Sequence, residues 1–71
     1  MAKDYYIARD AFKQEDLAAK KYAFYAHNCT NPEAKQLFNQ IGQVQQQSAQ
    51  RFQQMMNQFP IKLSFYRHLF S

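Results

Sequence analysis

Two long stretches on either side of one short break constrain what this chain can fold into. Residues 5–28 contain neither glycine nor proline, and residues 28–32 then read Asn-Cys-Thr-Asn-Pro. Proline disfavours helical geometry at the residue before it and suits the first turn of the helix that follows. The pattern therefore predicts helices over about 5–28 and 32–59, the second ended by Pro60. A short link between two long helices implies an antiparallel hairpin in an all-α chain.

Capping residues mark the starts of both predicted helices. Asp4 is a suitable N-cap for the first helix. The second helix has two possible caps one residue apart. Thr30 forms a capping box with Glu33, whereas Asn31 directly precedes Pro32 at the first helical position. The predicted domain organisation is a helical hairpin over 1–59 followed by a tail over 60–71.

The small size of the chain makes self-association an expected feature. Its 71 residues allow one domain, and a core this small is marginal without a disulfide, a structural metal or oligomerisation. The single Cys29 excludes an internal disulfide, and with His27 and His68 it is too few for a structural zinc site. Oligomerisation is the stabilising device that is left.

The charge pattern indicates neither a nucleic-acid ligand nor a membrane span. The net charge is +4, yet residues 34–71 hold only four bases, and these lie 16, 11 and 5 residues apart. Bases that bind phosphates cluster on one face or along one helix, so a solvated surface is the preferred interpretation. No apolar run approaches the roughly 18 residues of a membrane span. The N-terminal residues contain no apolar signal-peptide core, which predicts synthesis in the cytoplasm.

The second predicted helix is amphipathic and rich in glutamine. Its apolar stripe advances by about 3.67 residues per step, which is closer to an 11-residue repeat than to a heptad and predicts a nearly straight helix. The opposite side holds amides together with Lys35 and Arg51, and ten glutamines lie between residues 36 and 58. Two interpretations stay open for them: good helix formers on a surface, or a neutral face that packs against copies of itself. The stripe comprises Leu37, Ile41, Val44, Ser48, Phe52, Met55 and Phe59.

The first predicted helix has a second, thinner apolar stripe. A helix in a hairpin needs one apolar face, so this stripe requires a further partner: a second copy, the tail or another protein. For the tail we expect folding over this stripe, with docking to another protein or to a membrane surface as the alternatives. The predicted interface residues are Tyr6, Leu17 and Phe24 of the stripe and Phe65 and Phe70 of the tail.

One polar layer interrupts the predicted core near its middle. Antiparallel pairing sets Tyr22 level with Ile41, and it brings Glu15 to the height of Gln45 and Ser48. Polar layers of this kind serve as metal sites, as devices that set helix register, or as hydrated gaps.

Several short runs resemble the spore coat protein F-like (Coat F) family. These runs are Ile7-Ala8-Arg9-Asp10, Gln14-Glu15-Asp16-Leu17, Lys21-Tyr22, Thr30-Asn31-Pro32-Glu33-Ala34-Lys35-Gln36 and Gln54-Met55-Met56. The resemblance implies a hairpin that pairs or repeats into a four-helix, ferritin-like bundle. It also implies a structural role in the spore coat or its assembly during sporulation. The tail departs from the aromatic, Gly/Tyr/Pro-rich ending of the family.

The ferritin-like relation raises the question of a metal site. Di-iron bundles place a Glu opposite a Glu-x-x-His pair on a neighbouring helix. Here Glu15 faces Gln45 and Ser48, which stand where Glu and His are needed. A neutral amide and a hydroxyl are poor iron ligands, so we expect a degenerate position that holds no metal or other cofactor. His27 and Cys29 lie about 160° apart on a helix, and no catalytic residues are expected.

The leading hypothesis is a non-enzymatic structural or assembly protein of the spore coat. It would act as a self-associating helical bundle, a homodimer or larger, that packs with other coat proteins. One alternative is a ferritin-like metal or redox protein. The other is a helical adaptor subunit that binds a different protein through its tail.

Overall fold

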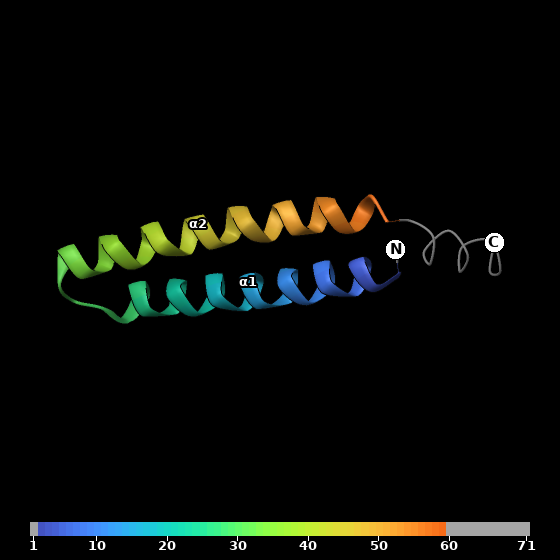
Figure 1. The fold of residues 1–71 in the computed structure, drawn as a ribbon. Coiled ribbons are helices and arrows are strands. Elements are labelled where there is room, and N and C mark those ends of the chain that lie inside the picture. Colours follow the sequence, from blue (N-terminus) through green and yellow to red (C-terminus); the bar gives the residue numbers. More distant parts are fainter. Residues whose placement is uncertain (1, 60–71) are drawn as a thin grey trace, which may run out of the picture.

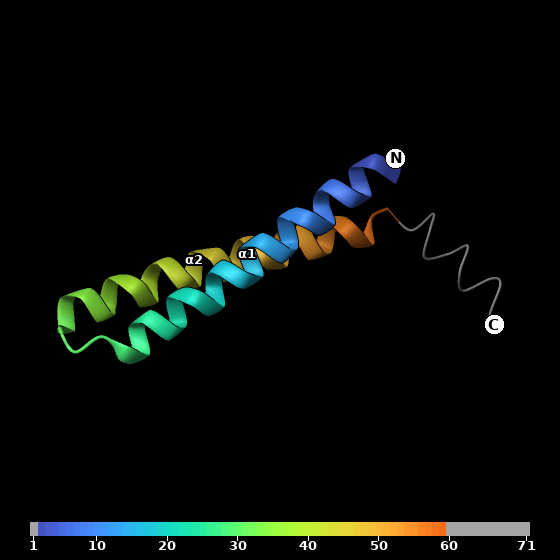
Figure 2. The same ribbon diagram turned by 90° about the horizontal axis from the view of Figure 1, so that it is seen from below.

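The protein is an antiparallel helical hairpin. The computed structural model describes residues 2–59, in which α1 spans Ala2–Asn28 and α2 spans Pro32–Asn57. The two helices lie side by side in opposite directions (Figure 1), and Figure 2 shows that they cross at a shallow angle. The described residues form no strand, so the predicted all-α hairpin is confirmed. Both helices start and end within three residues of the predicted bounds.

The structure decides between the two possible caps of α2. Asn31 is the N-cap, and its Oδ1 accepts a hydrogen bond from the backbone N–H of Ala34 at 2.9 Å. Pro32 follows at the first helical position, where its missing N–H costs nothing. Asp4 is not the N-cap of α1, because the helix begins before it. Its carboxylate lies in the first turn instead, where it interacts favourably with the helix dipole.

The contact between the helices is built on small residues. Ala8 and Ala26 of α1 are 2% exposed, and Ala49 of α2 is 4% exposed. Gly42 is the other buried residue of α2. Side chains this small let two helix backbones approach closely, and they leave little room between the helices for large side chains.

The two helices approach each other closely at Gly42. A Cβ built there would lie 3.5 Å from the Cβ of Tyr22 and 3.6 Å from the carbonyl oxygen of Ala19. The predicted pairing set Tyr22 level with Ile41, one residue from Gly42, so the hairpin register agrees with the prediction to within about a residue.

The residues of the helix contact recur at alternating intervals of four and three. This is the 3.5-residue repeat of a left-handed coiled coil, and the shallow crossing in Figure 2 fits it. The 11-residue spacing was predicted for the apolar stripe of α2, which is a different row from this one. We assign to the contact the buried and half-buried residues that follow this spacing: Ala8, Phe12, Glu15, Ala19, Tyr22 and Ala26 in α1, and Phe38, Gly42, Gln45, Ala49, Phe52 and Met56 in α2.

The predicted apolar stripe of α2 is divided by the structure. Phe52 lies in the helix contact, whereas Leu37, Val44 and Met55 are 54%, 61% and 42% exposed. In the sequence, two neighbouring rows of a helix appear as one apolar pattern. Only packing decides which of the two rows the other helix covers. Small and polar positions such as Gly42 carry little apolar signal, so the pattern does not mark them.

Three aromatic rings close the contact near the break. The ring centroids of Tyr22 and Phe38 lie 5.9 Å apart, those of Tyr25 and Phe38 5.5 Å, and those of Tyr22 and Tyr25 5.5 Å. Tilted and edge-to-face pairs at these distances each contribute about 0.5–1.5 kcal/mol beyond burial. The end of the hairpin that carries the break is thus held by larger side chains than its middle.

Gly42→Ala should stabilise the protein. The added methyl group would make ordinary van der Waals contacts at 3.5 Å or more, and alanine is favoured over glycine inside a helix by about 1 kcal/mol. Thermal unfolding followed by circular dichroism, at one fixed protein concentration, should give a higher Tm. Gly42→Leu is the matched contrast and should lower Tm, because its side chain must push the helices apart. A lower Tm for Gly42→Ala would contradict the close but unstrained contact described above.

Candidate interaction surfaces

One flank of the hairpin carries a shallow groove lined by small apolar and polar residues. Two adjoining hollows of about 160 and 240 Å³ run along it. Six of the lining residues each come directly after a contact position, three in each helix: Asp16, Lys20, Ala23, Asn39, Gln43 and Gln46. Because both helices contribute such residues to the same groove, they share this side of the hairpin. We call it the polar flank.

The opposite flank is an uncovered apolar surface. It is formed by residues that come directly before a contact position, and therefore lie on the side away from the groove. Five of the residues at these positions are large, apolar and exposed, and they share the flank with the exposed cations Lys21 and Arg51. We call this surface the free apolar face; it comprises Ile7 and Tyr25 of α1 and Leu37, Val44 and Met55 of α2.

A second apolar surface lies on the outer side of α1. Leu17 is nine residues from the buried Ala8 and from the buried Ala26, about two and a half turns in each direction, so it points away from α2. Leu17 and Phe24 are both 64% exposed, and Tyr6 is 39% exposed. These three residues form the α1 ridge. They were predicted as interface residues, and the structure places them where only another molecule or another segment can cover them.

The tail residues predicted for the interface, Phe65 and Phe70, lie outside the described residues.

At the start of the α1 ridge, the Arg9 guanidinium lies 5.0 Å from the centroid of the Tyr6 ring. Such cation–π contacts contribute about 0.5–1 kcal/mol at exposed sites. The ridge is therefore partly organised before any partner arrives.

A polar layer crosses the middle of the hairpin. Glu15 is the central residue of α1 and Gln45 lies next to the centre of α2, and both are half-buried. Counting from the contact between Gly42 and Tyr22, Ser48 reaches the height of Glu15 and of the exposed Gln14. The side-chain oxygen Oε1 of Gln45 is buried with no hydrogen-bond partner in the described chain.

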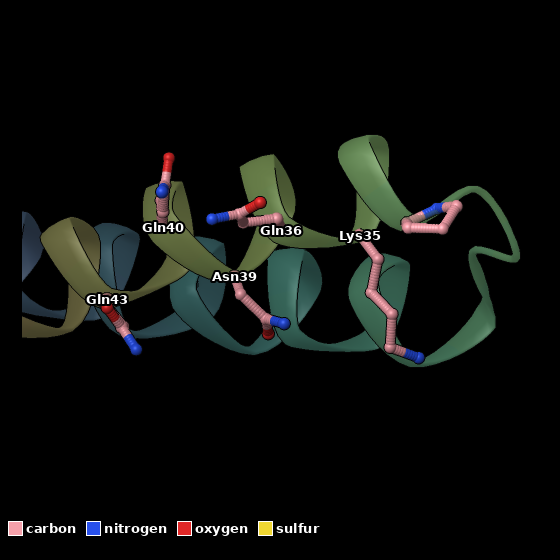
Figure 3. Close-up of a pocket in the computed structure, with 6 residues that line it drawn as sticks. Lys35, Gln36, Asn39, Gln40 and Gln43 are labelled. Atoms are coloured by element: carbon pink, nitrogen blue, oxygen red, sulfur yellow. The ribbon is translucent and has the colours of Figure 1, made fainter.

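The glutamine side of α2 carries a shallow pocket of about 380 Å³ near the break. In Figure 3 its labelled side chains point in different directions, with Lys35, Asn39 and Gln43 to one side and Gln40 to the other. The lining combines one cation with amides and contains no carboxylate or nucleophile. These side chains do not converge on a point, so the pocket is a stretch of polar surface rather than a small-molecule site.

Comparison with known families decides the relationship of the chain. Residues 3–59 match the Coat F domain, a range that covers nearly all of the hairpin. The chain belongs to the Coat F family. The resemblance noted from the sequence runs is thus confirmed, and the Coat F relationship indicates a spore coat protein. No curated protein and no solved structure matches the chain.

The polar layer of this Coat F protein is a poor metal site. Its donors are one carboxylate from Glu15, one neutral amide from Gln45 and one hydroxyl from Ser48. Within residues 2–59, no three His, Cys, Asp or Glu side chains come together as a metal-binding group. Iron sites in helical bundles need several carboxylates with imidazole nitrogen.

Two further features of the Coat F hairpin bear on its chemistry. His27 is exposed, and the Cys29 thiol donates a long hydrogen bond of 3.8 Å to the backbone oxygen of Asn31, so the two side chains are not arranged as a nucleophile and its base. The ion pair between Lys20 and Asp16, at 3.0 Å, is exposed and contributes little to stability. Neither described helix is long and apolar enough to cross a membrane.

Iron loading should leave the protein without bound metal. In the polar layer only the carboxylate of Glu15 could balance the charge of Fe²⁺. Removing it in Glu15→Ala should therefore leave the iron content unchanged. Elemental analysis after anaerobic incubation with Fe²⁺ and desalting should give background iron for both proteins. Stoichiometric iron in the wild type, lost in Glu15→Ala, would contradict the expectation and restore a ferritin-like function.

Proposed function

We propose that this protein is a non-enzymatic structural component of the spore coat that works by self-association. Membership in the Coat F family, whose members are typically structural, supports the role and the location in the coat. One observation supports the self-association. Among the described residues, the buried ones are the small Ala8, Ala26, Gly42 and Ala49, and no large side chain is fully buried.

The energetics of the apolar side chains favour pairing. Burying an exposed Val, Leu, Ile or Met contributes about 1.5–3 kcal/mol, and eight large apolar side chains of the hairpin are exposed. Soluble monomers rarely leave contiguous apolar surfaces uncovered. Two hairpins that pair through the free apolar face form a four-helix bundle with the polar flanks on its outside. This pairing would bury Leu37, Val44 and Met55 of both copies.

The α1 ridge supplies a second contact in this proposal. Leu17 and Phe24 point away from α2, so pairing through the free apolar face leaves them accessible. We assign them to contacts with further copies or with other coat proteins. The coat would then be built in two steps, first the bundle and then the contacts between bundles.

Val44→Glu should separate the paired hairpins. Pairing would bury a carboxylate in each copy and lose at least about 1.5 kcal/mol of apolar burial per copy, which raises the dissociation constant at least about 100-fold. Sedimentation equilibrium of the full chain measures this, and circular dichroism should still report helix. Gln47→Glu introduces the same charge on the exposed polar side of α2 and should leave the association unchanged.

Leu17→Glu distinguishes the two apolar surfaces. It should leave the pair intact, because Leu17 lies on the ridge and not on the free apolar face. If instead Leu17→Glu separates the pair and Val44→Glu does not, the α1 ridge is the pairing surface. A wild-type chain that stays a folded monomer at micromolar concentration would contradict the proposed function.

The glutamine side of α2 offers a surface for packing bundles together. Neutral amides do not repel copies of themselves, and they form hydrogen bonds side by side. Replacing Gln43, Gln46, Gln47, Gln50 and Gln54 with Glu should reduce dense assembly and its resistance to detergent, while the pair persists. The same five changes to Ala keep the surface neutral and separate charge from amide bonding. Unchanged assembly in the Glu variant would mean that the glutamines only solubilise the helix.

A further inference from the structure

The outer side of α1 combines exposed apolar side chains with cations. Leu17 and Phe24 of the α1 ridge lie in one row of the helix, and each is 64% exposed. On a helix the surface neighbours of a residue are those three and four positions away. At these positions around Leu17 and Phe24 there are three exposed lysines and no carboxylate. We call the three the lysine border: Lys13, Lys20 and Lys21.

The lysine border lies on both sides of the ridge. Lys13 and Lys20 directly follow contact positions, so they lie towards the polar flank. Lys21 directly precedes a contact position and lies towards the free apolar face, with its Nζ 5.9 Å from the centroid of the Tyr25 ring. The exposed ion pair of Lys20 with Asp16 is weak, and a partner can replace it at little cost. In the described part of the chain no carboxylate pairs with Lys13 or Lys21.

We propose that the α1 ridge binds an amphipathic helix of another protein that carries acidic side chains beside its apolar ones. Leu17 and Phe24 pack between the apolar side chains of that helix, and the lysine border pairs with its carboxylates. The inference rests on the proposed function, in which the ridge stays accessible in the paired hairpins, and it names the chemistry of the partner at that second contact.

A second copy of this chain is a poor occupant of the ridge. Two copies stacked in parallel, ridge against ridge, set each lysine of the border against itself. Two copies stacked antiparallel, with Leu17 against Phe24, set Lys20 against Lys21. Like charges that face each other across a contact disfavour it. The second helix of a copy offers no better complement, because Glu33 in its first turn is the one acidic residue of α2.

Residues 60–71 and a membrane surface fit the ridge less well. The sequence of 60–71 contains Lys62 and Arg67 and no acidic residue, so it does not complement the lysine border. Helices that lie on membranes bury a broad apolar face. The ridge is one narrow row, and the exposed Asp10 in the same row opposes anionic headgroups. A single helix that crosses α1 over Leu17 and Phe24 need not reach Asp10, and helices pack ridge into groove.

Binding of a synthetic peptide to the full-length chain tests the inference. The probe is a fluorescent amphipathic peptide of about three heptads, long enough to form a helix, with leucines in one row and glutamates on both sides of them. Its counterpart carries lysine in place of each glutamate. Fluorescence anisotropy should show saturable binding of one acidic peptide per chain, weakened by added salt. The lysine peptide should bind at least about tenfold more weakly.

Variants of exposed residues assign the binding to the ridge. Leu17→Ala should weaken binding of the acidic peptide about tenfold, because an apolar contact is lost. Lys13→Gln combined with Lys20→Gln should weaken binding and flatten its salt dependence. Gln40→Glu combined with Gln47→Glu changes the net charge equally on the outer side of α2. At physiological salt, where charges are screened over about 8 Å, this control should bind like the wild type.

Four results would overturn the inference. The acidic peptide fails to bind, or it binds no better than the lysine peptide. The third is binding that survives both Leu17→Ala and the combined lysine changes. The fourth is loss of binding in Val44→Glu but not in Leu17→Ala, which would place the peptide on the free apolar face. If phosphatidylglycerol vesicles bind the wild type but not Leu17→Ala, and the peptide does not bind, the occupant of the ridge is a lipid surface instead.

Sedimentation equilibrium on the same samples separates this inference from the proposed function. A wild-type dimer that does not bind the acidic peptide contradicts the inference and leaves self-association standing. A wild-type monomer that binds the peptide through Leu17 contradicts self-association and leaves the contact at the ridge standing.

Discussion

The close approach of the two helices through small residues determines the rest of this structure. Ala8, Ala26, Gly42 and Ala49 are the buried residues of the contact, and a backbone oxygen of α1 lies 3.6 Å from the place of a Cβ on Gly42. Where these small residues lie, the helices leave little volume between them for leucine or valine. The large apolar side chains are therefore displaced to one flank and to the outer side of α1. In a hairpin with a contact of this kind the two backbones pack closely, but large apolar side chains stay exposed.

The elements of the fold were predictable from local chemistry, whereas the packing face was not. Pro32, with Asn31 before it, ends one helix and starts the next through backbone sterics that act within a few residues. The row of α2 that forms the helix contact is decided instead by packing, because α1 can cover either of two neighbouring rows. Hydrophobicity favours the row of Leu37 and Val44, yet the helices met along Gly42 and Ala49 because close approach needs small residues. The spacing of alanine and glycine in heptads was the signal that could have identified this row.

The candidate site was predictable in part for a related reason. The height of Glu15, Gln45 and Ser48 follows from hairpin register, and the poor match to iron follows from the residue types alone. The unpaired state of Gln45 Oε1 could not be inferred from sequence, because it depends on where neighbouring donors point after packing. The α1 ridge lies between these cases: its amphipathic spacing is visible in the sequence, but its partner is not encoded in the spacing.

The unequal chemistry of the two flanks imposes an order on the proposed assembly. The free apolar face contributes about 1.5–3 kcal/mol for each large side chain that pairing buries. The amides of the polar surface contribute about 0.5–1.5 kcal/mol per hydrogen bond, because they exchange bonds with water. Pairing through the apolar face is therefore the stronger step of the proposed assembly. Any further growth must use contacts that are individually weaker and more numerous, such as Leu17, Phe24 and the glutamine side of α2. A coat component built in this way associates into a defined unit first and packs into a dense layer only at high local concentration.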